Sequence, residues 1–331
     1  MRNTLILLFL LALLAACNKK ETDSQRFLVK ANEELKLKNH PEAIRLYGEA
    51  IRLTPDYKEA YHNRGVAYYE INKHFEAVQD FNEALRIDPD FKDPYFARLN
   101  AYLAGGYYER GLSDSRKLKE EHPDSALVWS LEGSFLIALH RYQEAVDVLN
   151  TAIRLEPYYY DYVNRGMAQY NRYHYAEAKQ DLRTALAENP AEGSAWQNLS
   201  LCYAETGDYD SAMLCLGKAR ALETAGTYLD NNEGYILLRQ GRNEEALKRI
   251  NASIARDPKN PWALRNKAIY YYQQGDLSSA LRLLQQVEEI EPGLMHVNYY
   301  LGAIHRAMAD AATAETYFSQ ARSAGDPLAA E

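Results

Sequence analysis

The stretch 58–91, KEAYHNRGVAYYEINKHFEAVQDFNEALRIDPDF, holds one complete unit of a pattern that recurs along the chain. Its first half places small or aromatic residues on one face of a helix: Tyr61, Gly65 and Tyr68. Its second half repeats this spacing with Ala77, Phe81 and Ala84. Pro89 ends the unit, because a proline disfavours helix for the residue before it. We therefore predict two helices, whose backbones approach closely where Gly65 faces Ala77.

The same unit returns at a nearly constant interval. The prolines that close the units are Pro55, Pro89, Pro123, Pro157, Pro190, Pro258 and Pro292. The step is 34 residues, except for one step of 33 before Pro190, and Thr224 stands where one proline is due. A series of small residues keeps the same period: Ala43, Ala77, Gly111, Ala145, Ala178, Ala212, Ala246, Ala280 and Ala314. Such a period is typical of stacked helix–turn–helix repeats rather than of one globular core.

These units resemble the tetratricopeptide repeat (TPR). The family's aromatic–Leu–Gly–Tyr–Ala–Phe–Ala–Pro series is matched well by Trp129, Glu132, Gly133, Ala145, Ala152 and Pro157. The resemblance covers residues 24–328 and implies an all-α, right-handed superhelical solenoid of about nine repeats. These repeats would start near residues 24, 58, 92, 126, 159, 193, 227, 261 and 295. The resemblance to the TPR family also implies that the first helices of successive repeats line a concave groove, and that this groove binds peptide segments.

The third repeat departs from the pattern. Leu99 occupies the position where most other repeats have a small residue, and Gly111 replaces the alanine opposite it. A leucine at this contact should push the two helices apart, because there is little room beside a closely approaching backbone. The departure is either tolerated drift or a local change in the curvature of the superhelix.

The N-terminus has the form of an export signal. Arg2 supplies a positive charge, and the apolar run from Thr4 to Leu14 is shorter than the roughly 20 residues that a membrane-spanning helix needs. The run closes with Leu14-Ala15-Ala16-Cys17, which resembles the lipobox of bacterial lipoproteins. That resemblance implies a signal peptide at 1–16 and a lipid on Cys17. The residues that follow are polar and have no apolar periodicity, so we predict a flexible tether at 17–23. Ordinary secretion and an uncleaved anchor are the alternatives.

The resemblance to lipoproteins also bears on location. It implies attachment to the bacterial cell envelope through the acyl chains. Asn18 follows the cysteine, where an aspartate would suggest retention in the inner membrane, so we expect the outer membrane. Both the periplasmic face and the outer face stay open. The formal net charge of −8 argues against nucleic acid as a partner and against attraction to anionic headgroups.

We find no motif for catalysis. The sequence has no Gly-rich phosphate loop, no G-x-S-x-G, no H-E-x-x-H and no C-x-x-C, so we expect neither an enzyme nor a metal or cofactor. Cys202 and Cys215 lie on the two helices of the sixth repeat. We expect two small buried apolar residues there, with a disulfide as the alternative that an exported location would permit.

The positions that would line the groove carry amides and aromatic rings. An asparagine stands two residues before the small position of the first helix in five repeats: Asn63, Asn164, Asn198, Asn232 and Asn266. An amide can both donate to and accept from a peptide backbone, although asparagine is also simply common at this place in the repeat. Aromatic residues occupy further groove positions, among them Tyr69 and Phe96. Tyrosine and tryptophan are enriched at interfaces.

We predict that the main binding surface lies between residues 231 and 300. Its expected members, besides the asparagines above, are Asn231, Tyr235, Arg239, Trp262, Arg265, Tyr272 and Tyr299. The two arginines are expected to meet a carboxylate of the partner. The function predicted from the sequence is a non-catalytic, lipid-anchored adaptor that binds protein partners. The alternatives are binding of a glycan or peptidoglycan fragment by the aromatic face, and assembly of a secretin, pilus or other envelope machine.

Overall fold

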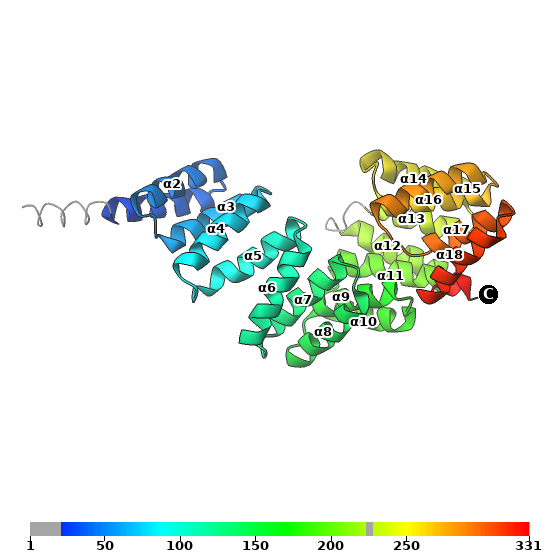
Figure 1. Cartoon of the computed structure of the whole chain (residues 1–331), viewed down its shortest axis with the longest axis horizontal. Coiled ribbons are helices and arrows are strands. Elements are labelled where there is room, and N and C mark those ends of the chain that lie inside the picture. The colour runs from blue at the N-terminus through cyan, green and yellow to red at the C-terminus, as the bar shows by residue number, and fades with distance from the viewer. Residues whose placement is uncertain (1–20, 223–227, 331) are drawn as a thin grey trace, which may run out of the picture. The chain divides into compact units, whose positions relative to one another are not determined.

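The computed structural model describes residues 21–222 and 228–330, and all regular elements in these ranges are helices (Figure 1). The all-α prediction is therefore confirmed. The predicted signal peptide at 1–16, the lipidation site Cys17 and the tether up to residue 20 lie outside the described residues. Residues 21–23, which were predicted to belong to the flexible tether, instead form the first turn of the helix 21–36. None of the described helices is long and apolar enough to cross a lipid bilayer.

The chain forms two compact units, which join between Pro123 and Asp124. The helices of the first unit are 21–36, α2 (His40–Leu53), α3 (Lys58–Glu70), α4 (His74–Ile87), α5 (Lys92–Ala104) and α6 (Tyr108–Glu121). The sequence has no Gly/Ser-rich linker at the junction, so composition alone did not indicate this division.

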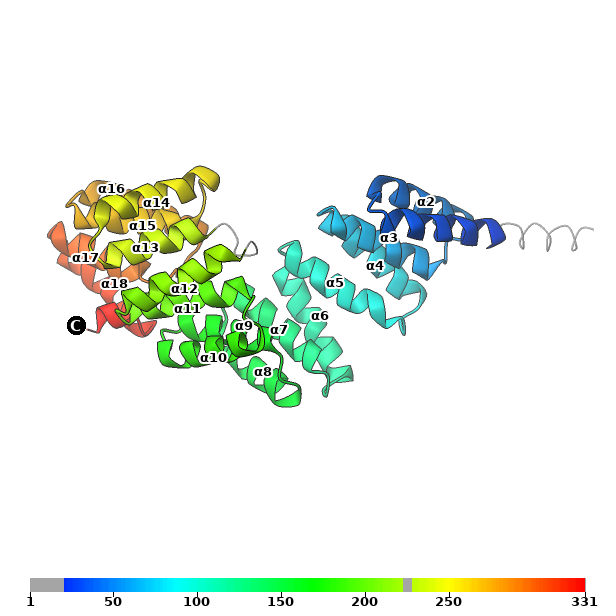
Figure 2. The same cartoon turned by 180° about the vertical axis from the view of Figure 1, so that it is seen from behind.

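The second unit continues the same alternation of first and second helices (Figure 2). Its elements are α7 (Ala126–Ala138), α8 (Tyr142–Leu155), α9 (Tyr159–Asn171), α10 (Tyr175–Glu188), α11 (Gly193–Glu205), α12 (Tyr209–Ala221), α13 (Leu229–Arg239), α14 (Asn243–Arg256), α15 (Pro261–Gln273), α16 (Leu277–Ile290), α17 (Val297–Ala307), α18 (Ala311–Ser323) and the 3-10 turn η1 (Pro327–Ala329).

The two helices of a repeat pack through small residues. A Cβ atom placed on Gly65 would lie 2.6 Å from the ring of Phe81, and one placed on Gly133 would lie 2.7 Å from the side chain of Leu149. Real Cβ contacts are not this short, so only glycine allows these backbones to approach. The predicted contact between first and second helices is thus present in both units.

The third repeat is looser, as expected from its leucine. Leu99 is almost completely buried at the position that glycine holds in α3 and α7. The contact between α5 and α6 is the sparsest among the within-repeat helix pairs from α3 onward. A side chain of four carbons at the closest point of approach holds the helices apart, because a packed interface cannot absorb the added volume.

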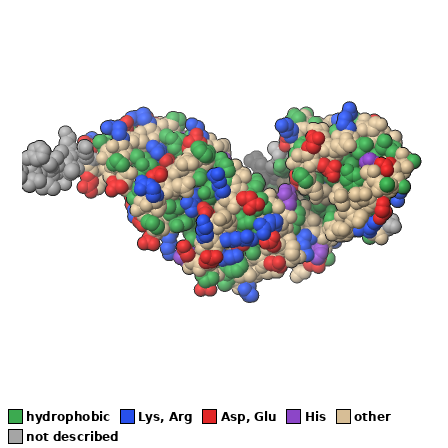
Figure 3. All heavy atoms as spheres, in the orientation of Figure 1, with side chains coloured by type: hydrophobic (Ala, Val, Ile, Leu, Met, Phe, Trp, Pro, Cys, Tyr) green, Lys and Arg blue, Asp and Glu red, His purple; other side chains and the backbone are tan. Residues whose placement is uncertain are grey.

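The solvent-facing side of the repeats carries charge pairs one helical turn apart. Arg45 pairs with Glu42 at 2.6 Å, and Arg242 pairs with Glu245 at 2.7 Å. Acidic and basic side chains are interspersed on the face shown in Figure 3. Exposed pairs of this kind contribute little to stability, so the fold depends mainly on the apolar contacts between helices.

Candidate functional site

The structure buries about half of the residues predicted to bind a partner. The buried members all belong to the second unit: Asn164, Asn231, Asn232, Tyr235, Arg265 and Asn266. The partly exposed members are Asn63 in the first unit and Asn198, Arg239, Trp262, Tyr272 and Tyr299 in the second. The buried side chains contact the chain itself, and these contacts occupy the groups that were expected to face a partner.

An amide and guanidinium network connects α13 and α15. The Nδ2 atom of Asn266 donates to Oδ1 of Asn231 at 2.8 Å, and Nη2 of Arg265 donates to Oδ1 of Asn266 at 2.9 Å. Arg265 also donates through Nη1 to the backbone carbonyl of Met295 at 3.1 Å. Its guanidinium lies 5.0 Å from the ring centroids of both Trp262 and Tyr235. Each of these groups is thus satisfied inside the fold, as burial requires.

Glu205, at the C-terminal end of α11, is the centre of a second network. Its carboxylate accepts hydrogen bonds from the hydroxyl of Tyr235 at 2.7 Å and from Nη1 of Arg239 at 3.0 Å. Nε2 of His296 lies 3.4 Å from Oε1 of the same carboxylate. On the other side of the ring, Nδ1 of His296 lies 3.0 Å from both carboxylate oxygens of Asp326. We call Glu205, His296 and Asp326 the His296 cluster.

The pKa values of this cluster favour its charged form. Burial disfavours an ionised Glu205, but the nearby charges of His296 and Arg239 outweigh burial and lower its pKa to about 2. Burial likewise disfavours the imidazolium form of His296, but the two carboxylates outweigh it and raise the pKa of the ring. An imidazolium held between two carboxylates is therefore the stable arrangement.

The His296 cluster holds a non-helical segment, 291–296, on the first helices of the second unit. Met295 is buried among Val163 and Tyr170 of α9 and Leu199 of α11. The ring of Tyr173 lies 5.5 Å from that of His296. The segment and the turn at Asp326 therefore lie on the groove-facing helices, where a bound peptide was expected.

The members of the His296 cluster were not among the residues predicted from the sequence to form a site. Glu205 and His296 are 91 positions apart. Each lies one repeat away from a residue that was selected by its position, Glu205 from Arg239 and His296 from Trp262, so the repeat position is a signal that could have found them. One local feature distinguishes His296: its φ of 65° is in the left-handed region, which a histidine adopts uncommonly. That feature is visible only in the structure.

The first unit keeps its groove positions more accessible. Nδ2 of Asn63 donates to Oδ1 of Asn32 at 3.0 Å, which links the first helices of two neighbouring repeats. The hydroxyl of Tyr47 donates to the same oxygen at 2.6 Å. Tyr69 is 36% exposed and Val29 is 55% exposed. The same repeat positions thus carry polar and aromatic groups that solvent can reach.

Cys202 and Cys215 are both free and buried. Burial raises the pKa of the Cys202 thiol to about 12. A thiol of this kind is protonated at neutral pH and unreactive, as expected of a small buried apolar residue. Among the residues that the structure describes, no group of three or more His, Cys, Asp or Glu side chains is arranged to hold a metal ion.

Comparison with known proteins identifies the repeats. Models of the tetratricopeptide repeat match residues 31–72, 59–91, 172–225 and 237–304, which together are more than half of the chain. The chain is a tetratricopeptide repeat protein. The crystal structure of a TPR protein from Parabacteroides merdae matches this TPR chain with a TM-score of 0.65 at 17% identity, over 75% of this chain and 99% of that one.

Two other proteins are similar to this TPR chain. The crystal structure of the APC/C hetero-tetramer Cut9–Hcn1 matches with a TM-score of 0.55 at 13% identity, over 92% of this chain and 74% of that one. The BBSome complex member BBS4 of Bos taurus is 22% identical over 81% of this chain, which spans 60% of the length of that relative. The solved structures show the fold. The family and the relative together support a scaffold for protein–protein interaction.

The raised pKa of His296 predicts that stability depends on pH. The stabilisation from its charged ring is fully present below the unfolded-state pKa of about 6.5 and is lost as pH rises through the higher folded-state value. Glu205 affects stability in the acid range. Its contribution to folding stability is present above its ordinary pKa of 4.5 and is lost as pH falls towards 2.

We expect the Tm of the wild type to fall more steeply on the alkaline side than that of a His296→Gln variant. Thermal melts of both proteins between about pH 6 and pH 9 measure this difference, since all other titrating groups are shared. Parallel curves would show that the ring is not charged in the folded protein.

Proposed function

We propose that this chain is a non-catalytic adaptor that holds peptide segments of partner proteins on the first helices of its repeats. We also propose that a lipid on Cys17 attaches it to the bacterial cell envelope. The family supports the first part of this proposal, and the apolar run ending in Leu14-Ala15-Ala16-Cys17 supports the second.

The observation that carries the adaptor proposal is the way the second unit holds its own segment 291–296. Arg265 donates to the backbone carbonyl of Met295, and the side chain of Met295 lies among residues of α9 and α11. Bonds to backbone atoms do not depend on the sequence of the bound segment, while pockets for side chains select among sequences. The first helices of this chain therefore carry the chemistry that an irregular peptide segment needs.

The first unit offers the corresponding positions to a partner. Asn63 is partly exposed beside Asn32, and Tyr69 and Val29 expose apolar surface on the same series of first helices. Tyrosine gives a large contact area with a polar tip, which favours interfaces. We place the partner's peptide segment on this face of the first unit.

Replacing Asn63 and Tyr69 together by alanine should weaken binding of the partner's segment at least about tenfold. The segment would lose its hydrogen bonds to the amide of Asn63 and its contact with the ring of Tyr69. A photo-cross-linker at position 69 of the full chain, used in envelope extract, identifies the partner and the segment that it contacts. A synthetic peptide of that segment is then titrated against the wild type and the Asn63→Ala/Tyr69→Ala variant by fluorescence anisotropy.

The matched control is Phe75→Ala/Glu83→Ala, which removes an aromatic and a polar side chain from the second helix α4. Phe75 is 54% exposed, so its loss should not disturb the fold. Equal binding by the two double variants would place the partner on another face. Retention of glycan alone would favour the glycan-binding alternative.

Replacing Cys17 with serine should leave the protein without lipid, because only a thiol can receive the acyl-bearing group. We expect the variant to leave the detergent-extracted membrane fraction and to lose the mass of the lipid. Fractionation and intact-mass spectrometry measure both changes. Membrane partitioning and mass identical to those of the wild type would exclude lipid attachment at this residue.

A further inference from the structure

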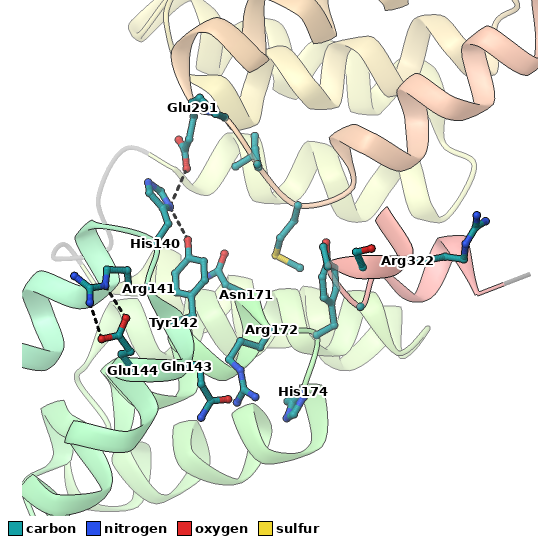
Figure 4. A pocket seen from close by; sticks show the side chains of 18 residues that line it. His140, Arg141, Tyr142, Gln143, Glu144, Asn171, Arg172, His174, Glu291 and Arg322 are labelled. Carbon is teal, nitrogen blue, oxygen red and sulfur yellow. Dashed lines mark hydrogen bonds and ion pairs between the residues drawn. The ribbon is translucent and has the colours of Figure 1, made fainter. Parts of the chain in front are cut away.

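A pocket of about 680 Å³ opens in the second unit (Figure 4). It lies where the α7–α8 turn and the α9–α10 turn meet the segment 291–295 and the end of α18, residues 322–325. This volume is within the usual range for sites that bind small ligands or a few residues of peptide. The pocket is separate from the face of the first unit discussed above, and none of the residues predicted to bind a partner lines it.

One wall of the pocket carries a carboxylate whose negative charge has no close positive partner. The side chain of Glu291 is largely buried, and the basic side chain nearest to it among the described residues is that of His140, whose Nδ1 lies 3.8 Å from Oε1. That separation is longer than a hydrogen bond. His140 instead forms its short contact, 2.8 Å, with the hydroxyl of Tyr142 (Figure 4). Burial raises the pKa of Glu291, as expected of a carboxylate without a close partner.

The pocket also carries a guanidinium without an acidic partner. Nη1 of Arg172 donates to the side-chain oxygen of Gln169 at 2.9 Å, and Arg172 forms no ion pair with any residue that the structure describes. The other two arginines in the lining are paired, Arg141 with Glu144 and Arg322 with Glu315. A carboxylate and a guanidinium, not bonded to each other, are thus available in one pocket.

The backbone at the pocket is held in an uncommon conformation. His140 and Tyr173 have φ values of 58° and 62° at the same position of their repeats. Lys38, Asn72 and Ala309 adopt it at the same position of other repeats, and four repeats have glycine there: Gly106, Gly207, Gly241 and Gly275. The conformation is therefore a general feature of the turn between the two helices of a repeat, and at the pocket it places His140 and Tyr173 in the lining.

We propose that this pocket binds a short peptide or peptide segment that carries a positive group and a carboxylate. The ammonium or guanidinium group of the ligand pairs with Glu291, its carboxylate pairs with Arg172, and the rings of Tyr142 and Tyr173 flank it. Charge-assisted hydrogen bonds and ring faces near a cation both favour this ligand. The charged groups of the ligand are either the free ends of a peptide or the side chains of a longer chain.

Three probes distinguish these sources when titrated into the full chain by calorimetry or NMR at about pH 8. Tetraglycine with free ends presents terminal charges, N-acetyl-Lys-Gly-Gly-Glu-amide presents side-chain charges, and fully blocked tetraglycine presents neither. We expect one or both charged probes to bind and the blocked probe not to bind. Absence of binding by both charged probes, or equal binding by the blocked probe, would overturn the proposal.

Substitutions then assign the contacts. Glu291→Gln and Arg172→Gln should each weaken binding of the probe at least about tenfold. Each substitution removes a charge-assisted hydrogen bond without changing side-chain size greatly. The matched controls are Glu289→Gln and Arg154→Gln, exposed residues outside the pocket, which should bind as the wild type does. Unchanged binding by Glu291→Gln, with an unchanged Tm, would exclude the assigned role of this carboxylate. These results are independent of the Asn63→Ala/Tyr69→Ala experiment on the first unit.

Discussion

Replacing Glu205 with alanine is expected to lower the free energy of unfolding by about 3–5 kcal/mol, the usual cost of removing one partner from a buried ion pair. Only 2% of the Glu205 side chain is exposed. The substitution would leave the buried ring of His296 and the partly buried guanidinium of Arg239 beside a cavity. Denaturant unfolding followed by circular dichroism measures the loss.

The control for this prediction is Glu188→Ala, at the exposed end of α10, which should change stability by less than about 0.5 kcal/mol. A second variant, Glu205→Gln, keeps the shape and part of the hydrogen bonding but removes the charge, and should be intermediate. A Glu205→Ala protein as stable as the control would show that the His296 cluster contributes no net stability. In that case the segment 291–296 would be held by apolar contacts alone.

The second large effect is expected from Gly133→Leu. A Cβ atom at this position would lie 2.7 Å from both Cδ2 and Cγ of Leu149, so the side chain cannot enter without separating α7 from α8. Overpacking of this kind costs about 1–3 kcal/mol. Because each repeat also packs on its neighbours, the loss should appear as a lower unfolding midpoint of the whole second unit.

Gly217→Leu is the matched control, since it makes the same substitution in α12 at an exposed position where a Cβ would meet no atom within 4 Å. We expect no loss there, and a gain of up to about 1 kcal/mol from the better helix propensity of leucine. If both leucine variants melt like the wild type, the contact at Gly133 is not as close as the structure describes.

The departure at Leu99 shows how far a repeat pattern can predict packing. The leucine predicts that α5 and α6 separate, because a single position decides how closely the two helices of a repeat approach. The sparse contact between α5 and α6 agrees with that expectation. The division into two units at Pro123 was not expected, because no residue at the junction breaks the repeat period.

The groove positions show what a repeat pattern cannot predict. The asparagines and aromatic residues were selected by repeat position alone, and a position in a repeat does not indicate what lies over it. In the second unit Asn266 bonds to Asn231 and Tyr235 bonds to Glu205, so both serve the fold in this structure. In the first unit Asn63 stays accessible at an equivalent position.

By itself, the sequence determined the helix pairs, their period and the class of solenoid, because these depend on contacts between residues close together in one repeat or in adjacent repeats. The tertiary structure decided which groove positions remain open. That outcome depends on the rotation and displacement accumulated over several repeats, which bring His296 to Glu205 across 91 positions. Small changes at each helix contact add along a solenoid, so no single repeat contains the information that closes the second unit on itself.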